Sequence, residues 1–249
     1  MRLEDVSDLL LYRDGLMLVV NKPAGLAVHR GPKGGLTFDS YFDQWRFGLP
    51  RAPALAHRLD RDTSGCLILG RHRKALDKLG ILFKQGKIAK TYFAIVEGHI
   101  EADEGLIDLP LARLDASRGW WMKVDPAGLP SQTRYQVRGR ARLGARAVTF
   151  VALYPLTGRT HQLRVHCASQ GWPIVGDAVY GRGAREGHEG YEMLHLLARA
   201  VSVPLSANKP AIEVQAPIPA HMHELMAACG FDVMADHAHM ATAHAHQAP

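Results

Sequence analysis

The chain has 249 residues, a formal net charge of +6 and a hydrophobic content of 47%, the balance of a soluble globular protein with a sizeable core. No apolar run approaches the roughly 20 residues of a membrane-spanning helix, and the acidic residues of the first segment argue against a signal peptide. The three cysteines are widely spaced without a CxxC motif, which argues against a disulfide framework, so we expect buried thiols in a reducing compartment, the cytoplasm.

In the first part of the chain, short strands and helices alternate. The expected elements are a strand at 16–20, a short helix at 37–47, a strand at 66–70, a helix at 72–84 and a strand at 91–98. Thr37 is the expected N-cap of the first helix. The second helix is predicted by the spacing of Ala75, Leu79 and Leu82.

The remainder of the chain is predicted to be mostly strands, because short apolar runs are separated by Gly, Pro and Asp. The expected strands lie at 106–111, 120–124, 133–137, 147–154, 193–205 and 211–217. One helix is expected within 157–171, with Thr160 and Gly171 as start and stop signals, and another at 219–228. Many strands with few helices indicate an α+β fold with a mostly antiparallel sheet.

The C-terminal segment differs in composition. Residues 229–249 are rich in Ala and His, and six of the fourteen histidines lie from His221 onward. Pairs such as His237 and His239 have a spacing that metal ligands use, but alanine-rich termini are usually disordered. We therefore expect one domain over 1–228 and a disordered tail over 229–249, with no functional metal site.

Basic charge is concentrated in one segment. Residues 57–91 contain nine Lys or Arg and three acids, so this window carries +6, the net charge of the whole chain. Clustered bases favour a polyanionic partner, and nucleic acid is the first candidate. A solvated helix face is the alternative.

Three polar clusters adjoin predicted strands, where a rigid scaffold can present functional groups. They are HRLDRDTSG at 57–65, KTYFAIVEG at 90–98 and TGRTHQLRVH at 157–166. In the first cluster, an ionised Asp60 beside an arginine would be a competent nucleophile or base. A structural ion pair or a turn cap is the alternative, and Asp62 is the better candidate for the cap.

Other chemistries are less favoured. Asp60 and Asp62 have a spacing suited to a glycosidase, but the segment is too basic for a neutral sugar polymer. His57, His161 and His166 form no zinc-binding pattern, so we expect them to make hydrogen bonds within the fold. No glycine pattern of a dinucleotide-binding or phosphate-binding loop occurs, so the sequence gives no sign of a nucleotide cofactor.

Together the three clusters resemble the catalytic, tyrosine and arginine motifs of the RluA family of RNA pseudouridine synthases, in a member without the N-terminal S4 RNA-binding domain. NKPAGL at 21–26 and GDAVYG at 176–181 also resemble family segments. The resemblance extends from about residue 10 to residue 218. It implies a single catalytic domain built on a long, mixed, mostly antiparallel sheet that is flanked by helices and loops.

The resemblance also implies catalytic roles. Asp60 would attack the target uridine, Tyr92 would stack on the flipped uracil close enough for proton transfer, and Arg164 would pair with Asp60 and orient it. Extruding a base costs a few kcal/mol, of which stacking on an aromatic side chain can offset roughly 1–3 kcal/mol. Whether Asp60 forms a covalent adduct with the sugar or drives elimination to a glycal stays open.

Four further residues would contact the substrate. Arg58 would enter the RNA stack in place of the extruded base, Leu163 would line the uracil pocket, and His57 and Lys90 would make additional contacts. The reaction breaks an N–C glycosidic bond and forms a C–C bond to the same sugar. It is redox-neutral, so no cofactor is expected.

The sequence therefore predicts an isomerase that converts specific uridines of structured RNA, a ribosomal or transfer RNA stem-loop, into pseudouridine. Because the catalytic core begins after about ten residues, we expect substrate choice to reside in the catalytic domain. We expect a monomer with no obligatory protein partner and no membrane association. The alternatives are a non-catalytic RNA-binding protein that uses the same basic face and, less favoured, a metal-dependent nuclease.

Overall fold

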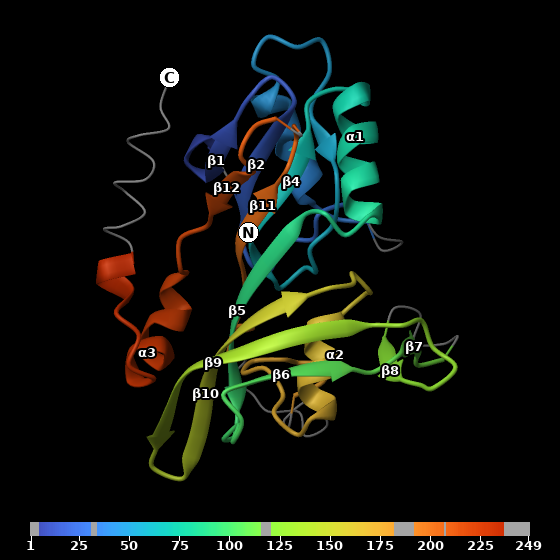
Figure 1. The fold of residues 1–249 in the computed structure, drawn as a ribbon. Coiled ribbons are helices and arrows are strands. Elements are labelled where there is room, and N and C mark those ends of the chain that lie inside the picture. Colours follow the sequence, from blue (N-terminus) through green and yellow to red (C-terminus); the bar gives the residue numbers. More distant parts are fainter. Residues whose placement is uncertain (1–4, 31–33, 116–120, 182–191, 207, 237–249) are drawn as a thin grey trace. The chain divides into compact units, whose positions relative to one another are not determined.

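The computed structural model describes residues 5–30, 34–115, 121–181, 192–206 and 208–236. The chain divides into two compact units, unit 1 from 1–90 and 198–217 and unit 2 from 91–197 and 218–249 (Figure 1). Strands dominate both units, and the strand pairs with a defined register are antiparallel, which confirms the expected α+β class. No helix of the described ranges is long and apolar enough to cross a membrane.

Unit 1 is built around β4, whose residues are all buried. Its strands are β1 (Leu10–Arg13), β2 (Met17–Lys22), β3 (Ala54–Leu55), β4 (Ser64–Gly70), β12 (Ile212–Gln215) and the second part of β11 (Leu196–Val203). The antiparallel pairing of β2 with β4 sets Met17 opposite Gly70 and Lys22 opposite Gly65. The loop that precedes β4 therefore lies at the Lys22 end of this strand pair.

The two longer helices of unit 1, α1 and η2, each bury one apolar face. In α1 (Arg73–Lys84), the buried residues are those predicted from the spacing, and the side chain of His72 caps the helix by accepting a hydrogen bond from Ala75 N. The helix expected at 37–47 is a 3₁₀ helix, η2 (Phe38–Trp45). Thr37 is its N-cap residue, but its hydroxyl donates to Asp39 instead of capping. A further 3₁₀ turn, η1 (Ser7–Leu9), precedes β1.

In unit 2, the main strands follow the spatial order β5, β10, β9, β6. They are β5 (Ala89–Glu97, within unit 2 from Thr91), β6 (Glu104–Asp108), β9 (Gln132–Leu143) and β10 (Arg146–Pro155), and a separate hairpin joins β7 (Leu111–Arg113) to β8 (Met122–Val124). The strand expected at 106–111 is thus two strands divided at Pro110, because proline cannot donate to a ladder. The strand expected at 133–137 extends to Leu143. Trp120, the first residue of the run at 120–124, lies outside the described residues.

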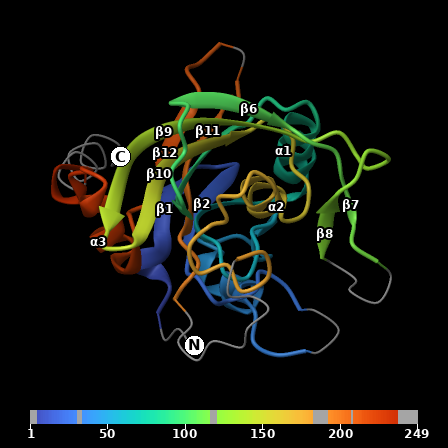
Figure 2. The same cartoon turned by 90° about the horizontal axis from the view of Figure 1, so that it is seen from below.

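The two faces of the β5–β10 pair bury different partners. Since side chains alternate along a strand, Ala94 and Val151 face α2 (Gln162–Ser169), whereas Phe93 and Phe150 face the other way and pack around Phe231. Figure 2 shows α2 within the curve of β6, β9 and β10, and α3 (Ala220–Ala228) beside the β9–β10 hairpin. The face that carries α2 is the one on which the predicted site residues of unit 2 gather.

Packing continues beyond the expected end of the domain at residue 228. The ring centroids of Phe231 and Phe150 are 5.2 Å apart, and Val233 is buried. The fold therefore includes the first part of the segment expected to be a tail. The rest of that segment, 237–249 with its paired histidines, lies outside the described residues.

Candidate active site

The predicted catalytic loop of unit 1 leads into β4. Leu59 is buried, Asp60 is half-buried and Arg58 is exposed. Gly65 has φ 102°, a backbone conformation that favours glycine, and it turns the chain from this loop into the buried strand. The loop thus holds the carboxylate of Asp60 partly out of water, while Arg58 remains accessible to a partner.

Arg61 and Asp62, the other charged pair of this loop, bond to each other. The guanidinium of Arg61 donates from Nε to Asp62 Oδ1 at 2.9 Å and from a terminal nitrogen to Asp62 Oδ2 at 3.1 Å. The role expected for Asp62, capping the turn, is therefore replaced by a two-bond ion pair. Such a pair at the surface contributes about 0–1 kcal/mol.

Lys22, the last residue of β2, anchors this loop through its side chain. Its side chain is fully buried, and Nζ donates to the carbonyl oxygens of Pro23 at 2.7 Å and Arg61 at 2.9 Å. Burial lowers the pKa of Lys22 to about 7, although the charges of Asp62 and Asp60 act in the opposite direction. Lys22 belongs to the NKPAGL segment, which resembles a family segment, but no role was predicted for it from the sequence. A lysine that ends an apolar strand just before a proline was the available signal.

The low pKa of Lys22 makes a measurable contribution to stability. Between about pH 7 and the ordinary lysine pKa near 10.5, the Lys22 side chain is protonated in the unfolded chain and mostly neutral in the folded one. The contribution of Lys22 to the free energy of unfolding therefore rises with pH in this range. We expect the unfolding free energy of wild type minus that of Lys22→Met to increase with pH above 7, by at most about 1.4 kcal/mol per unit. Urea unfolding from pH 7 to 9.5 measures this slope. The exposed Lys78→Met is the control and should follow the wild-type profile, and a flat difference for Lys22→Met would contradict the burial effect.

His57 has a structural contact in unit 1. Its Nε2 accepts a hydrogen bond from the backbone N–H of Ile68 at 2.9 Å, and its ring lies 4.8 Å from that of Phe83. Burial, with the charge of Lys90 as a smaller cause, lowers the pKa of His57 to about 3. Burial also lowers the pKa of Lys90. His57 is thus a neutral imidazole that holds β4, and its contact with substrate stays a prediction.

Tyr92 and Leu163 belong to one apolar cluster in unit 2. Tyr92 points to the α2 side of β5, as do Ala94 and Val96 two and four residues later. Leu163, on α2, is 6% exposed in this cluster, and Tyr92 packs against the cluster while remaining half-buried. The tyrosine is therefore partly core and partly exposed, and its stacking on uracil stays a prediction.

Arg164 forms a buried ion pair with Asp177, a residue to which the sequence analysis gave no role. Nε donates to Asp177 Oδ2 at 2.8 Å, and a terminal nitrogen donates to Oδ1 at 2.7 Å. The two side chains are 5% and 1% exposed. Burial alone would raise the pKa of Asp177, but the hydrogen bonds and charge of Arg164 outweigh burial and hold that pKa below its ordinary value. The guanidinium is thus fixed along one edge by two hydrogen bonds to the same carboxylate.

His161 and Tyr180 brace this ion pair. His161 Nδ1 lies 2.9 Å from the hydroxyl of Tyr180, which also accepts a hydrogen bond from Met122 N at 2.9 Å. The guanidinium carbon of Arg164 lies 5.3 Å from the centre of the Tyr180 ring. Asp177 and Tyr180 both lie in the GDAVYG segment, so that segment holds the arginine of another motif in place.

His166 bonds within the fold, as expected. Its ring nitrogens lie 3.0 Å from Thr133 Oγ1 and 3.0 Å from the carbonyl oxygen of Leu109. Among the residues that the structure describes, no group of three or more His, Cys, Asp or Glu is arranged to hold a metal ion.

The predicted site residues fall into two sets. Unit 1 carries Asp60, Arg58, His57 and Lys90, whereas unit 2 carries Tyr92, Leu163 and Arg164, of which Tyr92 and Leu163 share one apolar cluster. Within unit 2, the partner of Arg164 is Asp177. The pairing of Arg164 with Asp60 involves both units and stays a prediction.

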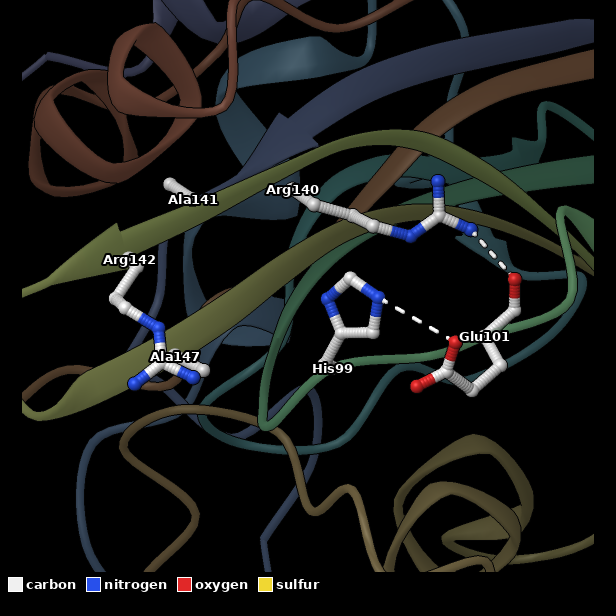
Figure 3. Close-up of a pocket in the computed structure, with 6 residues that line it drawn as sticks. All are labelled: His99, Glu101, Arg140, Ala141, Arg142 and Ala147. Atoms are coloured by element: carbon white, nitrogen blue, oxygen red, sulfur yellow. Dashed lines mark hydrogen bonds and ion pairs between the residues drawn. The ribbon is translucent and has the colours of Figure 1, made fainter.

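A shallow hollow of about 490 Å³ lies in a different part of unit 2. Figure 3 shows its lining residues, which are His99, Glu101, Arg140, Ala141, Arg142 and Ala147. Arg140 is engaged there by the carbonyl oxygens of Ile100 and Glu101 and by the carboxylate of Asp103. None of these residues belongs to the three motifs, so the hollow is separate from the predicted site.

Comparison with known proteins assigns the family. Residues 16–169, which include the three motifs, match the protein family described as RNA pseudouridylate synthase. The chain belongs to this family. Its members are isomerases that act on RNA, which confirms the expected enzyme class and the resemblance that the motifs indicated.

Individual relatives agree over most of the chain. An uncharacterized RNA pseudouridine synthase of Zymomonas mobilis is 39% identical over 212 residues, which cover 84% of this chain and 93% of that protein. Ribosomal large subunit pseudouridine synthase C of Vibrio cholerae is 34% identical over 230 residues, covering 90% of this chain and 70% of the relative. The solved structure of human RNA pseudouridylate synthase domain containing 1 superposes with a TM-score of 0.70 at 29% identity, over 93% of this chain and 98% of that one. This similarity confirms the expected fold.

Proposed function

We propose that this enzyme converts a uridine in structured ribosomal or transfer RNA into pseudouridine, acting in the cytoplasm as a monomer. Large-subunit ribosomal RNA is the first candidate substrate, because several relatives of this chain are ribosomal large subunit pseudouridine synthases. The observation that carries the proposal is the half-buried carboxylate of Asp60 in an otherwise basic segment. A protein that only binds RNA has no use for a carboxylate there, since it repels phosphate.

In this proposal, Asp60 acts on the sugar of the target nucleotide. Its carboxylate attacks C1′ or drives elimination across C1′ and C2′, and the N1–C1′ bond breaks so that uracil leaves with the bonding electrons. The uracil then rotates and C5 bonds to C1′, while the ester bond between Asp60 and C1′ breaks or, in the elimination route, the proton taken from C2′ returns to C2′. The C5 proton is removed and N1 takes up a proton, which gives pseudouridine. Tyr92 stacks on the flipped uracil and lies close to this proton, and Leu163 lines the pocket.

The arginines and lysines have binding roles in this proposal. Arg164 orients Asp60, and Arg58 takes the place of the extruded nucleobase. The RNA phosphates lie along the exposed basic side chains of α1. These exposed bases are Arg73, Lys74, Lys78, Lys84 and, just beyond the helix, Lys87. The contact between His57 and Phe83 supports this assignment, because it brings the C-terminal end of α1 to the Asp60 loop within unit 1.

The test maps pseudouridine in RNA that the enzyme has not previously modified. Total RNA from a strain that lacks the gene is incubated with wild type or with Asp60→Asn, and pseudouridines are located by carbodiimide-dependent stops of reverse transcription. We expect one or a few new stops in large-subunit ribosomal RNA with wild type and none with Asp60→Asn. A new stop only in transfer RNA would reassign the substrate, and no new stop in any RNA would overturn the proposal.

A further inference from the structure

Phe47 occupies a backbone position that is poorly suited to it. It lies between η2 and β3 with φ 44°, followed by Gly48 with φ 81°, and its side chain is 39% exposed. A left-handed conformation is unfavourable for a residue with a bulky side chain, whereas Gly or Asn adopts it readily. The backbone therefore does not explain a phenylalanine here, and a half-exposed ring contributes little to the core.

Two arginines lie against this ring. The guanidinium carbon of Arg13 is 4.4 Å from the ring centre and that of Arg71 is 5.9 Å away. Arg71 is fixed by hydrogen bonds to the carbonyl oxygens of Asp14 at 2.7 Å and Phe47 at 3.3 Å. Arg13 is exposed, so the ring orients a guanidinium that solvent can reach. We call Arg13, Phe47 and Arg71 the Phe47 platform.

The nearby acids are engaged elsewhere. Asp14 accepts the backbone N–H groups of Leu16 and Met17, both at 2.7 Å. Asp43 pairs with Arg46 at 2.9 Å. The platform thus combines a partly exposed aromatic ring with two guanidinium groups, and this combination suits a nucleobase, which stacks on aromatic rings and on guanidinium planes, together with its phosphate.

The platform lies in unit 1 at the end of β4 opposite the Asp60 loop. Gly70, next to Arg71, is five residues from Gly65, which corresponds to about 17 Å along a strand. α1 packs beside β4, as Figure 1 shows, and spans a similar distance of about 17 Å with its exposed bases. An RNA strand that follows these basic side chains of α1 from the Asp60 loop therefore reaches the platform.

We propose that the Phe47 platform is a second RNA-binding site, which stacks an unpaired nucleotide that flanks the modified stem-loop. This inference rests on the proposed function, in which RNA is the substrate, and it adds an RNA contact remote from the reacting base. The platform raises the affinity for RNA and takes no part in the chemical step.

The test uses fluorescein-labelled oligoadenylate of twelve nucleotides, which contains no uridine to enter the catalytic site. Binding to the full-length chain is measured by fluorescence anisotropy for wild type, Phe47→Asn, Arg13→Gln and the control Leu143→Asn. Leu143, the last residue of β9, is 42% exposed and matches Phe47 in exposure. We expect about fivefold or greater loss of affinity for the two platform variants, as base stacking contributes roughly 1–3 kcal/mol, and no loss for the control.

Thermal unfolding separates binding from folding. Asn tolerates φ 44°, so we expect Phe47→Asn to keep or raise the Tm while it weakens binding. If the Tm of Phe47→Asn falls, the ring has a structural role and this variant no longer reports binding alone. The oligoadenylate affinity of Arg13→Gln then tests the proposal, because the Arg13 side chain is exposed. Unchanged oligoadenylate affinity in Arg13→Gln would overturn the proposal.

Turnover distinguishes this inference from the proposed function. On a transcript that contains the modified uridine, both platform variants should raise KM about fivefold and leave kcat within twofold of wild type. Pseudouridine formation with unchanged KM in both variants would overturn the platform alone. Platform-dependent oligoadenylate binding without pseudouridine formation by wild type would overturn the proposed function alone.

Discussion

Asp60→Asn should reduce the rate of pseudouridine formation at least about 10⁴-fold, the scale seen when an essential nucleophile is removed. An amide carries no negative charge and cannot attack C1′ or take up a proton. The substitution is nearly isosteric, so the loop should keep its anchor, the hydrogen bond from Lys22 Nζ to the carbonyl oxygen of Arg61. Single-turnover release of tritium from RNA labelled at C5 of uridine measures the rate.

The matched control lies two residues away. Asp62→Asn removes a carboxylate whose partner is the exposed Arg61, and it should leave the rate within about threefold. RNA affinity, measured at fixed salt, should be unchanged or slightly higher in Asp60→Asn because a negative charge is lost. Turnover by Asp60→Asn above about 1% of wild type, or inactivation by Asp62→Asn instead, would show that the nucleophile has been misassigned.

Asp177→Asn should destabilise the protein by about 3–5 kcal/mol, because the substitution breaks a buried ion pair and removes the negative charge of Asp177 from beside the guanidinium of Arg164. At about 2–4 °C per kcal/mol for a chain of this size, the Tm should fall by roughly 10 °C. Asn can still accept the backbone N–H groups of Val179 and Tyr180, so the loss reports the ion pair. Activity should fall about 100-fold, as misplacing a group that positions the reacting atoms costs on that order.

A second variant separates stability from function. Arg164→Met/Asp177→Asn removes both charges and keeps an amide oxygen for the two backbone donors, so most of the lost stability should return. It should nevertheless stay inactive, since the guanidinium is absent. Recovered activity in this double variant would show that Arg164 and Asp177 serve only the fold.

The surface pair Arg73–Asp77 calibrates the measurement. Its side chains are 89% and 61% exposed and 3.2 Å apart, so Asp77→Asn should cost less than about 1 kcal/mol.

The pH dependence of stability gives a further check on Asp177. The pKa of Asp177 lies below its ordinary value, so its stabilisation is present above that value and is lost as the pH falls through the folded-state pKa. Asp177→Asn should lack this acid-dependent loss.

The amino-acid sequence by itself determined the local elements and the family. The apolar run of β4, the spacing of Ala75, Leu79 and Leu82 in α1, and the three motifs all depend on neighbours within about ten residues, and such patterns are legible in one chain. The same local information indicated that His166 bonds within the fold. It also predicted a helix at 37–47, although not that it would be 3₁₀.

Only the tertiary structure decided which side chains from distant segments meet. Asp177 lies 13 residues from Arg164 in a different motif, and Lys22 reaches a carbonyl 39 residues away. No periodicity connects such positions, because their pairing depends on how strands and loops pack in space. The Phe47 platform shows this most clearly. Its three residues come from β1, from the segment after η2 and from the end of β4. The pairing of β2 with both β1 and β4 brings Arg13 near Arg71, and Arg71 bonds to the carbonyl oxygen of Phe47.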